Sequence, residues 1–414
     1  MNKISKCRIC GNTNLKKIIN LGNLVLTGVF PKSKKENISS GDLELIKCHG
    51  NDDSYCGLVQ LSNSFDLNEM YGDNYGYRSS LNLSMVNHLE KIVEKIKNQI
   101  LLNKSDLVID IGSNDGTTLS FYDSSNLNLV GIDPTALRFK KYYDRNVKII
   151  SDFFSYKIIE KHNYFNKAKV ITSFAMFYDL EDPIDFAKTI SKTLDKNEGV
   201  WLLEQSYLPS MLKFNAYDTI CHEHLEYYSL KQIKYICDHS NLKIIDVELT
   251  KTNGGSFLIK CSHKNSKYQP NLKNINQLLE YEKNEGIDEL KIYDNFKINI
   301  ENSKKKLKNL IEKINKSGHK VYGIGASTKG NVILQYCDLS TNDINSIGEV
   351  NLDKFNSLTP GTNIPIVDEN LILNSKDNYL LILPWHFKEF FINSKNYKNQ
   401  KLIFPLPELE VIDC

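Results

Sequence analysis

Several features that would assign this chain to a common class of protein are missing from it. No apolar run approaches the roughly 20 residues that a helix needs to cross a bilayer, and the first ten residues do not resemble a signal peptide. Neither sign of charge dominates, because 52 lysines and arginines face 50 aspartates and glutamates, so nucleic acid is not an expected partner. Nine cysteines, an odd number, argue against a disulfide framework. We therefore expect a cytoplasmic protein with no membrane partner.

What the chain does have is length, apolar content and an uneven distribution of cysteine. Its 414 residues are enough for two or three domains, and its 41% of hydrophobic residues is ample for packed cores. Four of the nine cysteines lie in the first 56 residues. This distribution indicates a small cysteine-rich module at the amino end, followed by larger domains.

The four early cysteines predict a structural zinc site. Cys7 and Cys10 form a C-x-x-C pair, and Cys48 and Cys56 supply a second, looser pair with seven residues between them. Four of these seven residues look like an insertion, and His49 is a competing ligand. Four protein ligands leave no open coordination position, so the metal would stabilise a module with little core of its own. The alternative is a set of free or redox-active thiols.

The strongest motif begins at residue 107. A short apolar run ends in Asp110, two glycines follow at positions 112 and 116, and a second apolar run ends in Asp133. Glycines let the backbone approach a ligand, and an acid after the second strand can bind both ribose hydroxyls. An acid at the end of the first strand favours S-adenosylmethionine (SAM) over a dinucleotide. We expect Gly112, Asn114 and Gly116 to lie at the cofactor; the alternative is an ordinary strand-loop-helix corner.

Further apolar runs predict a doubly wound sheet around this motif. We expect residues 117–122 to begin the first helix. Strands are predicted at residues 129–133, 147–150, 168–173 and 200–204, and a closing hairpin pair at 242–249 and 255–261. Ligands bind beyond the carboxyl ends of such strands. The polar residues expected at that edge are Asp110, Asp133, Asp152, Ser173 and Glu204. Asp152 could accept a hydrogen bond from the adenine amino group while Phe153 stacks on the ring.

A dense polar cluster follows the fifth strand, between residues 217 and 229. Its centre is His222, Glu223 and His224. A histidine oriented by a carboxylate can move protons, whereas the spacing is not the H-E-x-x-H of a zincin protease. Adjacent residues point in different directions on a strand or helix, so these three can hardly converge on one metal ion. We predict proton transfer here; the alternative is a buried, hydrogen-bonded histidine pair.

The last third of the chain predicts a second, smaller sheet. Residues 274–317 have helical spacing, and a strand-loop-helix begins at residue 320. Residues 344–350 and 380–383 would extend this sheet in parallel. Gly323 and Gly325 could cradle a phosphate at a helix amino terminus, although a lone G-x-G is weak evidence. The alternative is a Rossmann-like domain that has lost its ligand.

From about residue 7 to about residue 387 the chain resembles the bacterial sugar C-methyltransferases that act on nucleotide-linked keto-deoxysugars. The matching segments are the cysteine module with its tail at 56–61, a Y-x-Y-x-S segment at 75–79, the I-G-S-N-D-G loop, the E-H segment at 219–224, and residues 253–256, 322–330, 359–366 and 383–386. The resemblance implies a zinc-binding domain (1–68), a Rossmann-like class I methyltransferase domain that binds SAM (69–265) and a smaller Rossmann-like domain (266–414). The resulting fold class is α/β.

The resemblance also implies an activity and the residues that carry it. The expected reaction is transfer of a methyl group from SAM to a carbon next to a ketone on the nucleotide-linked sugar, after a base removes the proton from that carbon. The tyrosines of the Y-x-Y-x-S segment would face the sugar, and a lysine of the carboxyl-terminal domain would lie near the diphosphate. The substrate-facing residues it implies are Tyr75, Tyr77, Ser79, Asn253, Gly254, Ala326, Ser327 and Lys329.

At two positions of the expected catalytic site, this chain differs from the family that it resembles. Cys221 stands where the family has a tyrosine proposed as the base, and Tyr178 stands where it tends to have a histidine. Cys221 could serve as a thiolate base if a neighbouring histidine lowered its pKa; Tyr178 and His224 are equally plausible bases. His224 is also a candidate donor to the enolate oxygen.

Because of these two differences from the family, we consider three alternative functions. An O- or N-methyltransferase acting on a similar sugar needs no carbanion. A SAM-binding scaffold without catalysis is a second alternative, and a zinc-dependent nucleic-acid binder is a distant third. We expect a monomer or a weak homodimer.

Overall fold

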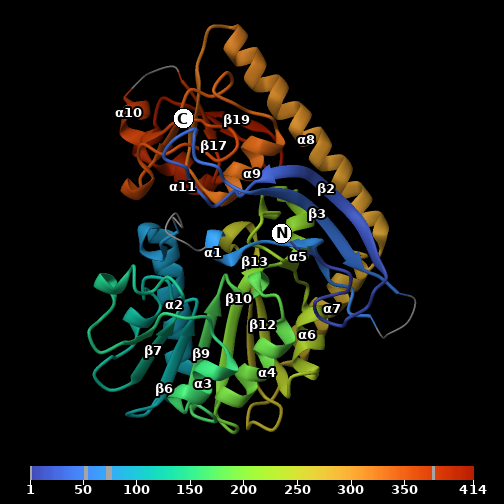
Figure 1. Cartoon of the computed structure of the whole chain (residues 1–414), viewed down its shortest axis with the longest axis vertical. Helices are drawn as coiled ribbons and strands as arrows, with labels where there is room; N and C mark the ends of the chain where they lie inside the picture. Colours follow the sequence, from blue (N-terminus) through green and yellow to red (C-terminus); the bar gives the residue numbers. More distant parts are fainter. Residues whose placement is uncertain (1, 51–54, 71–76, 375–377) are drawn as a thin grey trace.

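The computed structural model describes residues 2–50, 55–70, 77–374 and 378–414. Two sheet-based bodies lie one above the other, and the first strands of the chain run along one side of both (Figure 1). Among the described residues, no helix has the length and apolar character that crossing a membrane would require.

The lower body contains a seven-stranded sheet in the order β12-β13-β10-β9-β6-β7-β8. Neighbouring strands are parallel, except that β13 runs antiparallel to both β10 and β12. The strands are β6 (Leu107–Ile111), β7 (Asn128–Ile132), β8 (Lys148–Ile150), β9 (Ala168–Phe174), β10 (Val200–Ser206), β12 (Leu242–Thr250) and β13 (Ser256–His263). The predicted doubly wound sheet and its closing hairpin are confirmed. The strand order reverses between β6 and β9, which is where ligands bind in such sheets.

Helices cover both faces of this sheet. On one face, α2 (Leu83–Gln99) buries Ile92, Val93 and Ile96 against the strands. Asn82 begins α2, because its side chain accepts the backbone N–H of Ser84. The remaining helices of this body are α3 (Tyr156–His162), α4 (Pro183–Thr193), α5 (Leu208–Lys213), α6 (Leu230–Asp238) and α7 (Leu272–Asn284).

The helix expected at residues 117–122 does not form. Only a single 3₁₀ turn, Leu119–Phe121, is present there. The side chain of Asp123 accepts hydrogen bonds from the backbone of Ser125 and the amide of Asn126, so the chain turns at this point. Residues of this kind favour turns over helix interiors.

The amino-terminal strands form a separate sheet in the order β11-β4-β3-β2. Its members are β2 (Leu15–Val25), β3 (Ser40–Cys48), β4 (Val59–Leu61) and β11 (Glu226–Tyr227), beside a small pair, β1 (Asn2–Lys3) and β5 (Asn63–Ser64), and a short helix, α1 (Leu67–Met70). β11 belongs to the predicted methyltransferase segment, yet it pairs with β4. β2 and β3 extend along α8 to the upper body (Figure 1). The domain limits at 68 and 265 stay a prediction.

The upper body holds a six-stranded sheet in the order β16-β15-β14-β17-β18-β19, parallel except for β19. Its elements are α8 (Leu290–Lys316), β14 (Val321–Ile324), α9 (Thr328–Tyr336), β15 (Ile347–Glu349), β16 (Ile366–Asp368), α10 (Glu369–Leu373), β17 (Tyr379–Ile382), α11 (Lys388–Asn393), β18 (Lys401–Phe404) and β19 (Glu410–Asp413). The predicted second, smaller Rossmann-like sheet is therefore present.

The amino-terminal strands attach to this upper body by hydrogen bonds. The side-chain amide of Gln335 donates to the backbone oxygen of Val25 and accepts its N–H, and Asn331 donates to Thr27 O at 2.7 Å. These contacts bring the connection between β2 and β3 to the boundary between the two bodies.

Candidate active site and zinc centre

The loop after β6 has the backbone conformation that the motif predicts. Gly112, Asn114 and Gly116 all have positive φ, at 71°, 49° and 79°. The loop is tied to the end of β7, since Asn114 N–H donates to Asp133 Oδ2 at 2.9 Å. The two segments that the sequence predicts to form one site therefore meet.

The two acids of this motif differ in their surroundings. Asp110 is buried beneath the loop, where its carboxylate accepts the Thr172 hydroxyl at 2.6 Å, and burial raises its pKa to about 7. Asp133 accepts the backbone N–H and the hydroxyl of Thr135, both at 2.6 Å, in addition to the bond from Asn114. Asp110 thus supports the loop from below, and Asp133 shapes it at the edge of the sheet.

The other predicted cofactor residues also differ from one another in whether they are exposed or buried. Asp152 and Phe153 lie exposed after β8, at the carboxyl edge of the sheet. The Ser173 hydroxyl, by contrast, is fully buried and accepts the indole N–H of Trp201 at 2.9 Å. Its prediction as a cofactor contact is wrong for the side chain, which belongs to the core beneath the edge.

The Y-x-Y-x-S segment lies against the cofactor loop. Ser79 N–H donates to Asn114 Oδ1 at 3.0 Å, and Asn114 Nδ2 donates to Tyr77 O at 3.2 Å. The Tyr77 side chain is half exposed. Tyr75 lies outside the described residues. Asn114 therefore joins the predicted sugar-facing segment to the loop.

Four cysteine sulfurs converge at the amino end. The Sγ atoms of Cys7, Cys10, Cys48 and Cys56 all lie within 4.8 Å of one another, and the pairs Cys7–Cys56 and Cys10–Cys48 are each separated by 3.5 Å. Zinc–sulfur bonds of 2.3 Å in a tetrahedron place sulfurs about 3.8 Å apart, so the donor set fits zinc. His49 is not part of this group, and residues 51–54, the expected insertion, are not among those described.

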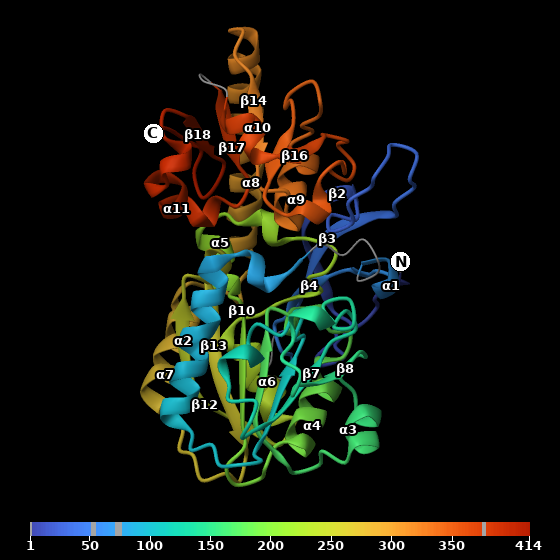
Figure 2. The same cartoon turned by 90° about the vertical axis from the view of Figure 1, so that its left-hand side faces the viewer.

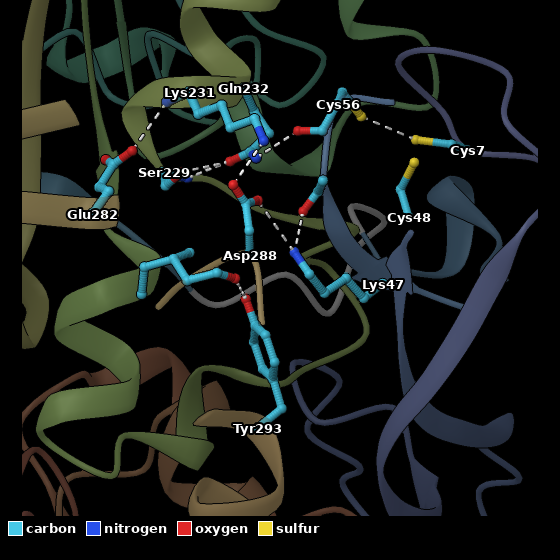
Figure 3. A network of polar contacts seen from close by, with 12 residues as sticks. Cys7, Lys47, Cys48, Cys56, Ser229, Lys231, Gln232, Glu282, Asp288 and Tyr293 are labelled. Carbon is cyan, nitrogen blue, oxygen red and sulfur yellow. Dashed lines mark hydrogen bonds and ion pairs between the residues drawn. The ribbon is translucent and has the colours of Figure 1, made fainter. Parts of the chain in front are cut away.

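A network of polar contacts joins the four-cysteine cluster, hereafter the zinc knuckle, to the lower body (Figure 3). Gln232, on α6, donates from Nε2 to the backbone oxygen of Cys56 at 2.8 Å. Helix α6 therefore helps to position one of the four cysteines. The buried Lys47 donates to Gly57 O at 2.8 Å and lies 3.8 Å from Asp288 Oδ1. Through Lys47, the zinc knuckle is connected to Asp288 in the segment between α7 and α8.

The zinc knuckle also contacts the residues that directly follow the E-H segment. Arg8, inside the C-x-x-C pair, donates to Leu61 O at 2.8 Å and lies 3.8 Å from the buried Glu226 carboxylate. Pairing of β4 with β11 continues this contact, because Leu61 N–H donates to Leu225 O. The residues just after His224 are thus anchored by the zinc-binding module.

Within the E-H segment, the side chains of Cys221 and His222 are buried. Cys221 is fully buried in a hydrophobic core, and burial together with the neighbouring Glu223 raises the pKa of its thiol well above its usual value. The thiolate base considered for Cys221 is therefore wrong. His222 packs on Phe65 and contacts Leu24 O at 3.1 Å, and burial lowers its pKa to about 4. It is a structural histidine between the segment and the amino-terminal strands.

His224 is held in one tautomer. Its Nδ1 lies 2.9 Å from Thr219 O and must donate there, which leaves Nε2 as an acceptor. Burial, aided by the charge of Lys329, lowers its pKa to about 3, so the ring is neutral at neutral pH. In this tautomer Nε2 can take a proton before it can donate one to an enolate oxygen, and the catalytic role of His224 stays a prediction. The ring of the buried Tyr178 lies 4.1 Å away, centroid to centroid.

Glu223 lies where three parts of the chain meet. A side chain at Gly28, in the β2–β3 connection, would place its Cβ 2.0 Å from Glu223 Oε1, so only glycine fits there. Thr328, at the start of α9, hydrogen-bonds to the same carboxylate, whose pKa is raised by burial. Glu223 Oε2 is buried and finds no partner in the described part of the chain.

Further buried polar groups gather at the boundary between the two bodies. Lys329 Nζ donates to Asn253 O at 3.1 Å, across the boundary. Asp218 Oδ2 accepts the indole N–H of Trp385 at 2.8 Å. Asp218 Oδ1 and His386 Nδ1 are buried without a partner within the described ranges. Buried polar atoms are normally satisfied by protein or water, so these atoms indicate a site that a polar ligand or water completes.

The loop between β14 and α9 contains Gly325, and its polar groups bond to other residues of the upper body. Ala326 N–H donates to Glu349 Oε2 and Ala326 O accepts from Lys354, while the Ser327 hydroxyl caps α9 by accepting Gly330 N–H. A Cβ at Gly325 would lie 2.8 Å from Pro384. The backbone of Ala326 and the hydroxyl of Ser327, which were expected near a phosphate, are thus engaged within the upper body, and the charged Lys329 lies at the boundary between the two bodies.

Asn253 and Gly254 form a tight turn at that boundary. Both have positive φ, at 52° and 90°, and Gly254 packs beside Trp385. Sequence reasoning did not single out Asp218 or His386 as site residues, although both lie within segments that it did name.

Comparison with known proteins matches three consecutive parts of the chain to three family models. Residues 7–71 match a family model described as “Putative zinc binding domain”, residues 85–247 one described as “Methyltransferase domain”, and residues 251–407 one described as “C-methyltransferase C-terminal domain”. C-methyltransferase NovU of Streptomyces niveus is 26% identical over 419 residues, covering 99% of this chain and 97% of NovU.

Two solved methyltransferase structures each cover less than half of this chain. A SAM-dependent methyltransferase of Clostridium acetobutylicum is 14% identical, covers 42% of this chain and 90% of its own, and has a TM-score of 0.33. Phosphoethanolamine N-methyltransferase 2 of Haemonchus contortus, in complex with SAM, is 18% identical, covers 40% of this chain and 39% of its own, and has a TM-score of 0.30. TM-scores this low support no conclusion about this chain.

The fold, the cofactor loop and the matched domains define a SAM-dependent methyltransferase with a structural zinc ion bound by four cysteines. More narrowly, the chain joins a zinc-binding domain, a methyltransferase domain and a C-methyltransferase carboxyl-terminal domain, and it is similar to C-methyltransferase NovU over nearly its whole length.

Proposed function

We propose that this protein transfers a methyl group from SAM to a carbon next to the ketone of a nucleotide-linked keto-deoxysugar. The observation that carries the proposal is a set of buried polar atoms that have no partner among the described residues, at the boundary between the methyltransferase body and the carboxyl-terminal body: Asp218 Oδ1, Glu223 Oε2 and His386 Nδ1. A polyhydroxylated sugar offers the donors and acceptors that such groups lack. The likeness to C-methyltransferase NovU over nearly the whole chain supports carbon as the acceptor.

Lys329 would bind the anionic part of this substrate. It projects from the first turn of α9 into the boundary, and among the described residues only one of its three N–H bonds is used, toward Asn253 O. A lysine here provides a charge-assisted hydrogen bond for a diphosphate. The half-exposed Tyr77, held by Asn114 beside the cofactor loop, would face the sugar ring.

The cofactor residues would hold SAM at the carboxyl edge of the sheet. Asp133 lies at the position for ribose hydroxyls, and Asp152 and Phe153 lie exposed at the neighbouring strand for the adenine ring. When bound there, SAM supplies an electrophilic methyl group. The protein's own contribution is to remove the proton next to the ketone and to hold the resulting nucleophilic carbon in line, since orientation can supply much of the rate.

Mass spectrometry of the purified protein with SAM and a panel of nucleotide-linked 4-keto-deoxysugars, run in heavy water, tests this proposal. A product heavier by one methyl group, together with deuterium at the carbon beside the ketone, is expected. A methylated product without any exchange would instead favour an oxygen or nitrogen acceptor. Bound SAM without turnover of any sugar would contradict the proposed substrate class.

A further inference from the structure

A lysine side chain is buried beside the zinc knuckle. Lys47 directly precedes the ligand Cys48 on β3, and its side chain is 0% exposed. Lysine is among the residues least often buried completely, because removing an ammonium group from water costs free energy unless other groups compensate its charge. The surroundings of Lys47 therefore have to supply that compensation.

Contacts from three directions fix the ammonium group (Figure 3). Lys47 Nζ donates to the backbone oxygen of Gly57, the residue directly after the ligand Cys56, at 2.8 Å. It lies 5.4 Å from the centre of the Tyr293 ring and 3.8 Å from Asp288 Oδ1. A Cβ at Gly57 would lie 2.8 Å from Asp288 Oδ1, so only glycine leaves room for this arrangement. The charge of Lys47 is thus held next to the segments that carry two of the four ligands.

The carboxylate next to Lys47 compensates only part of its charge. The Asp288 side chain is 44% exposed, and its Oδ2 accepts a hydrogen bond from Lys231 at 2.7 Å. Two lysines therefore share one partly exposed carboxylate. Arg8, inside the C-x-x-C pair, lies instead opposite the buried carboxylate of Glu226, 3.8 Å away. A net positive charge remains on the Lys47 side of the zinc knuckle.

A zinc centre at the four cysteines accounts for this charge. Four thiolates outweigh the charge of one Zn²⁺ ion, so the loaded centre is an anion. The side chains of Cys7, Cys48 and Cys56 are buried, and a buried anion needs nearby cations or hydrogen-bond donors. The Asn12 amide donates to Cys48 Sγ at 3.4 Å but is neutral, whereas the charge of Lys47 interacts with both Cys48 and Cys56. The ammonium group and the metal–thiolate group thus compensate each other.

The zinc knuckle and Lys47 belong to a sheet that contacts both bodies. Strands β3 and β4 lie at the level where the upper and lower bodies meet (Figure 2). Within this sheet, β2 contacts α8 and α9, and β4 pairs with β11. Asp288 lies between α7 and α8. A charge that stabilises the zinc centre therefore acts on the junction of the two bodies.

We propose that Lys47 is the buried counter-charge of the zinc centre, a positioning residue that strengthens zinc binding by stabilising the negative metal–thiolate group. The charge carries this effect, so an uncharged side chain of similar length does not replace it. Groups outside the ligand set commonly change metal affinity by about 10- to 100-fold. The inference rests on the zinc site alone and requires neither SAM nor a sugar.

The test compares the zinc affinity of Lys47→Met and Lys47→Arg with that of the wild type. Methionine is close to lysine in length but uncharged, whereas arginine keeps the charge. Lys16→Met is the matched control, because Lys16 lies opposite Lys47 on β2 and is exposed. Competition with a chromogenic zinc chelator measures the Kd for zinc on the full-length chain. Thermal melting of the metal-free proteins reports separately on folding.

For Lys47→Met we expect the Kd for zinc to rise by about 10- to 100-fold, while the metal-free variant melts within a few degrees of the metal-free wild type. Lys47→Arg should bind zinc more tightly than Lys47→Met, because it restores the charge. Lys16→Met should match the wild type within about twofold, since exposed charges are screened by solvent and salt. A side chain that only fills space would instead be replaced by methionine without loss of zinc affinity.

Asp288→Asn separates the effect of charge from that of shape. The amide keeps the size of the side chain but removes the negative charge beside Lys47, so zinc should bind as tightly as in the wild type or more tightly. An unchanged Kd in Lys47→Met, or weaker zinc binding in Asp288→Asn, would overturn the proposal. If Lys47→Met does not fold, the direction of the change in Asp288→Asn still decides between the two.

Discussion

Cys221 occupies the position where the family resemblance implies a tyrosine, and its surroundings keep it protonated. Burial and the adjacent Glu223 both disfavour the thiolate. This residue therefore fills space in the core beneath the E-H segment. The sequence identifies the substitution, but only the three-dimensional surroundings show that it removes a base.

Cys221→Ala should retain turnover within about threefold of wild type, with a modest loss of stability from the lost side chain, on the order of 1 kcal/mol. Steady-state rates and urea denaturation measure the two effects. A loss of turnover of 100-fold or more in a folded variant would mean that the thiol takes part in catalysis after all.

Asp110 gives a prediction about pH. Its pKa is raised to about 7 by burial, from an unfolded value of about 3.9. The folded protein therefore binds more protons at this residue than the unfolded chain between these two pH values, and its contribution to stability is lost as pH rises through 7. In Asp110→Asn this loss is absent, so the free energy of unfolding of the variant should rise relative to wild type between pH 5 and pH 8.

Denaturant titrations of the SAM-free protein at the two pH values measure this difference, with the exposed Asp294→Asn on α8 as the control. A difference between Asp110→Asn and wild type that does not change with pH would show that Asp110 is ionised in the folded protein.

At the scale of elements, the zinc knuckle is joined by strand pairing to the strand that follows the E-H segment. β4 pairs with β11, and Arg8 lies against Glu226 on β11. His224 lies two residues before β11, so the position of its ring depends on this pairing. A structural metal can therefore influence catalysis without touching the substrate.

Removal of zinc should lower stability and turnover together. Cys48→Ser breaks the ligand set, and we expect an apparent melting temperature lower by about 5–10 °C, equivalent to a loss of about 2–3 kcal/mol, with turnover reduced at least tenfold. Cys414→Ser, outside the ligand set, is the control. Metal analysis, thermal melting and rates are measured on the same samples; full activity in a metal-free Cys48→Ser protein would refute the connection.

The sequence predicts elements best where one periodic pattern decides them. The strands of the methyltransferase sheet are buried apolar runs, so their order along the chain could be predicted. The helix expected after Gly116 was wrong, because the hydrogen bonds of Asp123 turn the chain. The pairing of β11 with β4 joins residues more than 160 positions apart, and no local pattern indicates it.

At the scale of the whole molecule, the proposed site is shared between two bodies and the amino-terminal strands. Lys329 contacts Asn253 from across the boundary, and Glu223 meets Gly28 and Thr328. The sequence predicts the residue types of this site, but their juxtaposition arises from contacts between domains.

Lys329 should bind substrate and not cofactor. Lys329→Met removes a charge-assisted hydrogen bond worth about 1.5–3 kcal/mol, so KM for the nucleotide-linked sugar should rise by roughly 10- to 100-fold while the Kd for SAM is unchanged. Lys305→Met, exposed on α8, is the control. Titration calorimetry with SAM and initial-rate kinetics separate the two; an unchanged KM would place the diphosphate elsewhere.

The central claim is that this protein forms a carbon–carbon bond. The most direct measurement is nuclear magnetic resonance of the product made with SAM carrying a ¹³C-labelled methyl group and a nucleotide-linked 4-keto-deoxysugar labelled with ¹³C in its ring. A one-bond coupling between the transferred methyl carbon and the ring carbon beside the ketone is the predicted result. A methyl carbon with no one-bond coupling to any ring carbon would show that oxygen or nitrogen is the acceptor and would contradict the account.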